Sequence, residues 1–374
     1  MFKGGEIMAK PYDVAAYYWP AYHDEPRWRR FMPDGEGEWQ TIRKAAPKFP
    51  GHWQPRVPAW GYLDEADPRV MEKKIDAAAS YGVNVFIFDW YWYENQPFLE
   101  EALTRGFLGA QNNDRVRFFV MWANHDATTL WDLNQSHEHR VVWPGAADRT
   151  SFDRATGRLI RRFFGHPSYY RIDGKPVLSI YEIGTLIKGL GGLEAAREAL
   201  EGLRGRVRDA GFPGLHLQAI LWENIPASPG MIPGDRAKTQ NNTIAYLGFD
   251  SLTNYQWCHY VSPTGSYRDW GNTAITAWEK WAGEFSVPFH PHVSIGWDTN
   301  PRFATAKQDL VTGCTPGLFA DFMRKAMRFV DAEGLAPRLI TVNSWNEWSE
   351  GSYLEPDTVN GTRYLEAVRD ALAR

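Results

Sequence analysis

Short apolar runs rich in β-branched and aromatic residues recur along the chain, and most are followed by a segment with helical periodicity. The runs predict strands over residues 13–19, 83–90, 116–123, 176–181, 215–222, 249–255, 291–297 and 338–345. The periodic segments predict helices over residues 68–81, 151–165, 192–211, 267–285, 316–333 and 361–373. Strands that alternate with helices indicate a parallel sheet.

The predicted strands are apolar almost throughout, which indicates burial on both faces, as in a closed parallel barrel. We therefore expect an α/β protein with one (β/α)8 TIM-barrel domain over residues 1–374. Its long loops would include 20–67 and 124–150, and the fifth crossover, 223–248, is interpreted mostly as loop. An open doubly wound sheet is the alternative. Such a sheet would place a Gly-rich phosphate-binding turn after the first strand, and the sequence there is YYWPAYHDEPRW.

Composition supports a globular protein with a substantial core and restricts its partners. Hydrophobic residues make up 44% of the chain and charged residues 23%. The net charge of −4 provides no basic field for nucleic acid or an anionic membrane, so neither partner is expected. The two cysteines show no metal-type spacing, and no signal-peptide-like apolar run is present. We expect a cytoplasmic location unless a leader has been removed.

Aromatic and polar residues coincide at the ends of the predicted strands. The chain has 18 tryptophans, and in a barrel of this kind the active site lies where the strands end. Aromatic faces stack on sugar rings while carboxylates and amides bind hydroxyl groups, so we expect an oligo- or polysaccharide substrate. The expected substrate-binding residues at these ends are Tyr18, Trp19, His23, Asp89, Trp90, Trp122, Asn124, Glu182, Trp222, Tyr255 and Trp297.

The segment TVNSWNEWSEGSYLEP, residues 341–356, concentrates polar groups at the end of the eighth predicted strand. If NEWSE forms a helical turn, Glu347 and Glu350 share a face with Cβ atoms about 5–6 Å apart. Retaining glycosidases hold their two carboxyl groups about 5–5.5 Å apart, so the spacing favours retention with this pair as catalysts. Asn346, Trp348 and Glu355 complete the expected substrate-binding set. Glu355 precedes a proline and is expected to fix the loop rather than act as a third catalyst.

Two histidine pairs are candidate metal ligands. His137 and His139 lie in a polar loop, and His290 and His292 lie at the start of the seventh predicted strand, away from the expected site. We therefore expect neither a metal nor another cofactor.

The loop NEWSEGSYLEPD resembles the signature loop of family 99 glycoside hydrolases, the endo-α-mannosidases and endo-α-mannanases, and of the related WbsX-type proteins. The similarity extends to YYWPAYH, GVNVFIFDWYWY, FFVMWANHD and GKPVLSIYE. The resemblance implies a (β/α)8 barrel that hydrolyses an internal α-glycosidic bond with retention and without a metal. It further implies that Glu347 acts as a base on the 2-hydroxyl of the sugar, giving an epoxide-like intermediate. Glu350 would protonate the leaving oxygen and then activate water.

The loop differs from the mannosidase pattern at one position of its centre. That branch reads EWHEG, whereas Ser349 replaces the histidine here, and SYLEP replaces a Thr-Gln-Ile version. The sequence is thus more similar to the WbsX-type proteins, which are often labelled glycosyltransferases. Two alternatives to a hydrolase follow: a glycosyltransferase that uses a nucleotide sugar, and a carbohydrate-binding barrel without activity. A transferase would need a diphosphate site, and no Gly-rich turn, basic cluster or DxD motif stands out.

Overall fold

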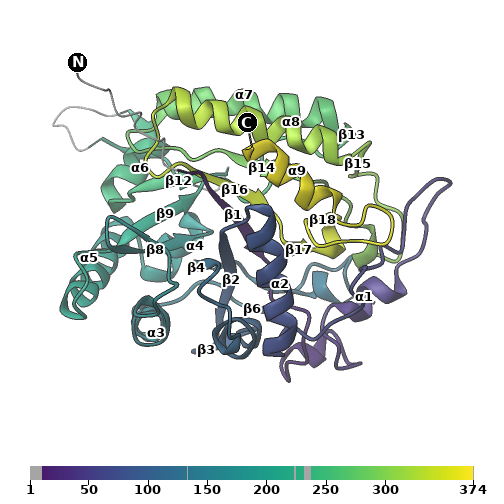
Figure 1. Cartoon of the computed structure of the whole chain (residues 1–374). Helices are drawn as coiled ribbons and strands as arrows, with labels where there is room; N and C mark the ends of the chain where they lie inside the picture. Colours follow the sequence, from purple (N-terminus) through teal and green to yellow (C-terminus); the bar gives the residue numbers. More distant parts are fainter. Residues whose placement is uncertain (1–10, 133, 223–224, 231–236, 374) are drawn as a thin grey trace, which may run out of the picture.

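The protein forms a (β/α)8 barrel (Figure 1). The computed structural model describes residues 11–132, 134–222, 225–230 and 237–373. The barrel strands are β1 (Asp13–Tyr18), β2 (Val85–Tyr93), β4 (Arg117–Trp122), β8 (Lys175–Ile180), β9 (His216–Ile220), β12 (Ser251–Thr253), β14 (His292–Ser294) and β16 (Leu339–Asn343). They pair in parallel in the order β12-β9-β8-β4-β2-β1-β16-β14. The two ends of the sheet meet where the Leu252 N–H donates to the Pro288 carbonyl at 2.9 Å and the His290 N–H donates to the Leu252 carbonyl at 2.8 Å. The predicted barrel is confirmed.

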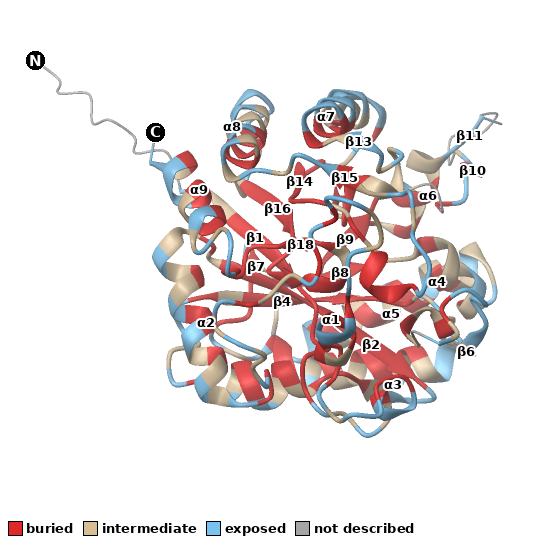
Figure 2. Cartoon of the chain, turned by 90° about the vertical axis from the view of Figure 1, so that its right-hand side faces the viewer, coloured by how far each residue is buried: buried red, intermediate tan, exposed pale blue. Residues whose placement is uncertain are grey.

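Helices cover the outside of the barrel, with their apolar faces turned inward and their outer faces exposed (Figure 2). The predicted helices correspond to α2 (Pro68–Tyr81), α3 (Arg149–Leu159), α5 (Leu193–Asp209), α7 (Tyr267–Glu284), α8 (Pro316–Ala332) and α9 (Arg363–Leu372). The bounds of α2 follow from its sequence. Asp67 caps the helix by accepting from the Arg69 N–H, Pro68 fills the first turn, and Gly82 ends it with φ of 91°.

Several short helices and strands were not predicted from the sequence. They include α1 (Trp39–Lys44), α4 (Ile183–Leu190), α6 (Gln240–Leu247) and β3 (Gln96–Phe98), which forms a hairpin with β2. Within the fifth crossover, which was expected to be mostly loop, α6 is a short helix that was not predicted, and Thr239 caps it. The remaining short strands are β5 (Ala127–Thr128), β6 (Val141–Trp143), β7 (Arg171–Ile172), β10 (Ser228–Pro229), β11 (Lys238–Thr239), β13 (Gly265–Ser266), β15 (Val311–Thr312), β17 (Asn346–Glu347) and β18 (Ser352–Tyr353). Helical turns also occur at Trp28–Arg30, Ala102–Phe107, Thr129–Trp131, Ile160–Phe164, Trp257–His259, Asn300–Arg302 and Trp348–Glu350.

The alternation of side chains along each strand decides which residues face the barrel interior. Tyr17 points inward, where its hydroxyl donates to the Asn254 carbonyl at 2.9 Å, and its neighbour Tyr18 points outward and stacks on Phe88. The same alternation on β2 turns Asp89 inward and the residue after it outward. Every second residue of a strand end is therefore unavailable to a site inside the barrel.

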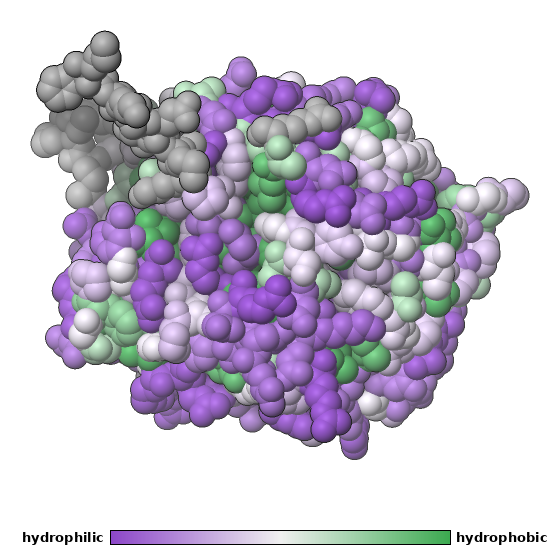
Figure 3. Space-filling view, in the orientation of Figure 1, coloured by the Kyte–Doolittle hydropathy of each residue, from purple (hydrophilic) through white to green (hydrophobic). Residues whose placement is uncertain are grey.

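Polar side chains fill part of the barrel interior below the site. His292 Nδ1 lies 2.9 Å from the Thr341 hydroxyl and its Nε2 lies 3.1 Å from the Ser294 hydroxyl, so both ring nitrogens have partners. Among the described residues, no group of three or more His, Cys, Asp or Glu side chains is arranged so that it could hold a metal ion. None of the helices in the described ranges is long and apolar enough to cross a bilayer. The face shown in Figure 3 is mostly hydrophilic, with hydrophobic residues in small separate patches.

Candidate active site

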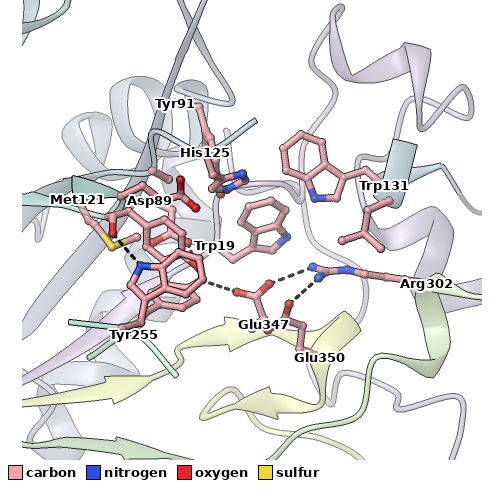
Figure 4. Close-up of a pocket in the computed structure, with 15 residues that line it drawn as sticks. Trp19, Asp89, Tyr91, Met121, His125, Trp131, Tyr255, Arg302, Glu347 and Glu350 are labelled. Carbon is pink, nitrogen blue, oxygen red and sulfur yellow. Dashed lines mark hydrogen bonds and ion pairs between the residues drawn. The ribbon is translucent and has the colours of Figure 1, made fainter. Parts of the chain in front are cut away.

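A cavity of about 290 Å³ opens at the C-terminal ends of the barrel strands. Aromatic side chains and carboxylates dominate its wall (Figure 4). The lining residues are Trp19, Asp89, Tyr91, Met121, Ala123, His125, Leu130, Trp131, Tyr181, Glu182, Trp222, Tyr255, Arg302, Glu347 and Glu350. The strand-end position of this cavity agrees with the location expected for the active site of a (β/α)8 barrel.

The loop after β16 delivers the carboxylate pair. Its first part, β17, pairs in antiparallel fashion with β18, and a single 3₁₀ turn, Trp348–Glu350, connects them. The predicted helical turn is thus a 3₁₀ turn, with Glu347 just before it and Glu350 at its end. The Ser344 hydroxyl anchors the start of the loop by accepting from the Glu347 N–H at 2.7 Å. Gly351 ends the turn with φ of 65°, a conformation that favours glycine.

One arginine connects the two carboxylates. Arg302 donates from Nη2 to Glu347 Oε1 at 3.0 Å and from Nη1 to Glu350 Oε1 at 2.6 Å. Figure 4 shows Arg302 reaching the pair from the side opposite Tyr255. Since the two terminal nitrogens of a single guanidinium hold both groups, the two carboxylates lie close together, as their spacing in the sequence predicted.

A third carboxylate, that of Glu38, binds the same arginine through its remaining nitrogen, Nε. Arg302 Nε donates to Glu38 Oε1 at 3.2 Å, and the Trp19 indole N–H donates to Glu38 Oε2 at 2.6 Å. The hydroxyl of Ser349 also donates to Glu38 Oε1, at 2.9 Å. The residue at which the loop departs from the mannosidase pattern therefore helps to hold the support of Arg302.

Burial and neighbouring charges act on the ionisation of the pair. Burial raises the pKa of Glu347 well above its ordinary value, the neighbouring carboxylate of Glu350 raises it further, and the charge of Arg302 opposes both effects. Burial likewise raises the pKa of Glu350, again against Arg302. Burial also raises the pKa of Asp89 well above the ordinary range. Burial thus favours a proton on each of these carboxyl groups, whereas Arg302 favours the ionised form of the two glutamates.

Several expected site residues do line the cavity together. They are Trp19, Asp89, Glu182, Trp222 and Tyr255, in addition to Glu347 and Glu350. The Tyr255 hydroxyl lies 2.8 Å from Asp89 Oδ2 and 3.0 Å from Glu347 Oε2, which links the ends of β2, β12 and β16. The Trp222 indole N–H donates to the Tyr181 carbonyl at 3.2 Å, so its ring is fixed at the cavity wall.

Other expected contacts lie on the wrong face of their strands. Trp90 points toward the helix layer, where its indole N–H donates to Glu100 at 2.8 Å. Trp122 packs on Phe152 of α3, and Tyr18 also lies outside the barrel. The expectation that these three residues contact the substrate was wrong, because side chains alternate along a strand and these three face the helix layer.

The remaining expected contacts support the site from outside the cavity. Asn124 exchanges two hydrogen bonds with the backbone of Glu182, each 2.8 Å long, and Asn346 bridges the backbone N–H and carbonyl of Trp19. The Trp348 indole N–H donates to Glu355 Oε2 at 2.9 Å. His23, buried, and Trp297, partly buried, also lie outside the lining, with the pKa of His23 lowered by burial to about 4.

A buried charge cluster lies beneath the signature loop. Lys74 forms ion pairs with Glu65 and with Glu355, the latter at 2.6 Å, and Glu65 also accepts from the Asn346 amide at 2.8 Å. Glu355 is thus held by a lysine of α2 and by the indole of Trp348, and its expected role of fixing the loop stays a prediction. Burial raises the pKa of Glu65 to about 7 against the opposing charge of Lys74.

Other residues that line the cavity were not predicted from the sequence. Tyr91 follows Asp89 by two positions and so shares its face, a signal that strand alternation could have supplied. Trp131 and Arg302 lie in short helical turns within loops, where no periodic pattern points to them. Arg302 in particular acts through contacts with Glu38 and the carboxylate pair, all distant in the sequence.

The fold and cavity define a class of protein, the (β/α)8 barrels that carry a carboxylate pair in the loop after the last strand. Within that class, the sequence model of the family described as glycosyltransferase WbsX matches residues 14–368, and the chain belongs to this family. The expected resemblance is thereby confirmed.

Relatives and solved structures extend this relationship. The chain is 29% identical over 369 residues to the uncharacterized protein WxcX of Xanthomonas campestris pv. campestris, covering 97% of this chain and 50% of WxcX. It thus spans about half the length of the curated relatives it matches. It shares its fold with a GH99 endo-alpha-mannosidase from Bacteroides thetaiotaomicron, with a TM-score of 0.58, 16% identity and 96% of each chain covered. A glycoside hydrolase-like protein aligns with a TM-score of 0.62 and 15% identity over 99% of this chain and 98% of that one.

Proposed function

We propose that the protein is a retaining glycoside hydrolase that cleaves internal α-glycosidic bonds of a polysaccharide, with Glu347 and Glu350 as its catalytic pair. The observation that carries the proposal is the position of this pair, held side by side by Arg302 in an aromatic cavity at the strand ends. The fold shared with the endo-alpha-mannosidase of B. thetaiotaomicron supports the same reaction class. A mannan-like or bacterial polysaccharide is the proposed substrate.

The proposed reaction has two steps. In the first, Glu347 takes the proton of the sugar 2-hydroxyl, O2 attacks C1, and the C1–O bond to the leaving sugar breaks as Glu350 protonates the leaving oxygen. In the second, Glu350 takes a proton from water, the water oxygen attacks C1, and the C1–O2 bond opens as O2 recovers its proton from Glu347. Two inversions at C1 give net retention.

The surroundings of the pair suit these roles. Glu347 accepts from Arg302 and lies within hydrogen-bonding distance of the Tyr255 hydroxyl, and donors of this kind stabilise a carboxylate that acts as a base. Glu350 has one oxygen engaged by Arg302, and burial favours a proton on the group. Trp19, Trp131 and Trp222 in the wall offer faces for sugar rings.

The family description favours a second candidate, a glycosyltransferase acting on a nucleotide sugar. Such a donor carries a diphosphate that needs cationic partners. Arg302 is the single lysine or arginine in the cavity lining as the structure describes it, and its guanidinium already hydrogen-bonds three carboxylates. The cavity is therefore better suited to a neutral sugar than to a diphosphate.

The proposal is tested with Glu350→Gln and Glu347→Gln on a panel of α-mannans and bacterial polysaccharides. The wild-type protein releases reducing ends, and Glu350→Gln loses cleavage while keeping polysaccharide binding. Glu333→Gln, which changes an exposed carboxylate at the end of α8, serves as the control. An unchanged rate in Glu350→Gln contradicts the assignment. Tight binding of a nucleotide sugar supports the transferase, and binding without cleavage supports a carbohydrate-binding barrel.

A further inference from the structure

The hydrogen bonds of Tyr255 require more protons than the tyrosine can supply. Its hydroxyl oxygen lies 2.8 Å from Asp89 Oδ2 and 3.0 Å from Glu347 Oε2. A phenol carries one proton, and an ionised carboxylate is an acceptor without a donor. With both carboxyl groups ionised, one of these two contacts would bring an anionic oxygen against a phenol oxygen with no proton between them. Two hydrogen bonds therefore require one proton on Asp89 or on Glu347.

The contacts of the two carboxyl groups differ in a way that locates this proton. Glu347 accepts a second hydrogen bond from the cationic Arg302, which stabilises its ionised form. Asp89 is 3% exposed, it forms no ion pair with any described residue, and its Oδ1 has no hydrogen-bond partner among them. Ionising a buried carboxyl group without a cation is costly. The proton is therefore favoured on Asp89.

The titratable groups around Asp89 reinforce this difference. Four phenols and two carboxylates act on Asp89. The phenols come from four different barrel strands or the segments after them and belong to Tyr17, Tyr91, Tyr181 and Tyr255. The carboxylates are those of Glu347 and Glu350. Phenols stay neutral near pH 7 and carboxylates repel a further negative charge. None of these groups compensates an ionised Asp89.

We propose that Asp89 is a neutral carboxylic acid in the free protein near pH 7 and that it positions the proton of Tyr255. The acid donates to the phenol oxygen, so that the Tyr255 hydroxyl donates to Glu347 rather than to Asp89. Asp89 is in this sense a positioning residue for the base, and its catalytic meaning rests on the proposed function.

The arrangement makes a prediction about high pH. When Asp89 loses its proton, Tyr255 faces two anionic acceptors, and its hydrogen bond to Glu347 is lost for part of the time. Activity then falls on the alkaline side as Asp89 ionises. Asparagine in place of Asp89 keeps an N–H donor directed at Tyr255 at every pH, so this substitution removes the alkaline loss.

The location of the proton is tested on the free, full-length chain without any substrate. Infrared difference spectra of protein with ¹³C-labelled aspartate or ¹³C-labelled glutamate distinguish the two residue types at pH 7. We expect a protonated-acid band that shifts with aspartate labelling, disappears in Asp89→Asn and persists in Glu347→Gln. A band that disappears in Glu347→Gln and persists in Asp89→Asn overturns the proposal.

The role in catalysis is tested by pH profiles of kcat/KM. Asp89→Asn is expected to lose less activity at pH 6 than Asp89→Leu and to move the alkaline limb to higher pH. Asp89→Leu, which has no donor, and Tyr255→Phe are expected to lose about 10-fold or more. A loss in Asp89→Asn as large as in Asp89→Leu contradicts the positioning role. If no polysaccharide is cleaved, the proposed function fails, and the infrared result still decides where the proton lies.

Discussion

Replacing Arg302 with methionine removes the cation on which three buried carboxylates depend. Glu38 and Glu347 are almost fully buried, and Glu350 has a side chain 12% exposed. Methionine keeps much of the volume of the arginine stem and adds no charge. The carboxylates then either remain as unpaired buried anions or take up protons. Both outcomes lower the free energy of unfolding.

The size of this loss can be estimated in two ways. Breaking a buried ion pair by removing one partner typically costs about 3–5 kcal/mol. Keeping one glutamate protonated at pH 7, when its pKa in the unfolded chain is about 4.3, costs roughly 3.7 kcal/mol. The two estimates agree, so we expect Arg302→Met to destabilise the protein by about 3–5 kcal/mol at pH 7.

The pH dependence has a definite sign. Loss of Arg302 raises the folded-state pKa values of Glu347 and Glu350 further above their unfolded values, because Arg302 opposes the effect of burial on both groups. The folded variant then binds more protons at intermediate pH than the folded wild type, while the unfolded chains bind the same number. Its stability therefore falls as pH rises. The difference in the free energy of unfolding between wild type and variant is therefore largest at pH 8. It shrinks toward pH 5 by up to about 1.4 kcal/mol per pH unit for each carboxylate involved.

Urea unfolding followed by tryptophan fluorescence at pH 5, 7 and 8 measures both effects. Arg105→Met is the matched control, because Arg105 forms an exposed i,i+4 pair with Glu101 and its loss is expected to cost about 0.5 kcal/mol or less. The proposed role of Arg302 is refuted if Arg302→Met loses no more unfolding free energy than this control, or if its loss grows as pH falls.

Other substitutions test further parts of the structure. Because burial raises the pKa of Glu65 to about 7, above its unfolded value, wild-type stability should fall as pH rises from about 4.5 to 7, and Glu65→Gln should flatten this slope by roughly 1.4 kcal/mol per pH unit in urea unfolding. Equal slopes contradict this. Ser349→Ala removes a buried hydrogen bond to Glu38 and should cost about 1.5–3 kcal/mol in the same assay, whereas no loss shows that the bond is dispensable. Trp131→Ala should raise KM about 10-fold with little change in kcat, because Trp131 lines the cavity and can stack on a sugar ring. Trp297→Ala, outside the lining, should leave KM unchanged, and equal effects of the two substitutions contradict the assignment of Trp131 to the cavity.

The fold could be predicted from the sequence because its strands are unusually apolar. Each observed barrel strand overlaps its predicted range, and α2 begins and ends at the predicted residues because Asp67, Pro68 and Gly82 mark its bounds. The short α4 and α6 were missed, since eight residues give too little periodicity to separate a helix from a loop. The expectation of a single domain stays a prediction.

The site could be located from the sequence but not resolved in detail. Glu347 and Glu350 stood out because a local motif places them three residues apart after the last strand. Trp90 was expected to stack on the substrate because it is an aromatic residue at a strand end, next to Asp89, although adjacent strand residues face opposite sides. Arg302 could not be predicted, because its role comes from contacts with residues 45 or more positions away. Long-range contacts of this kind leave no local pattern.

The most direct test of the central claim is the anomeric configuration of the first product. An α-linked polysaccharide that the protein cleaves is incubated with wild-type protein, and the newly formed reducing ends are followed by ¹H NMR before mutarotation equilibrates them. The proposed retaining mechanism predicts that the α anomer appears first and that Glu350→Gln releases none. First release of the β anomer would contradict the mechanism, and so would equal release by the Glu350→Gln variant.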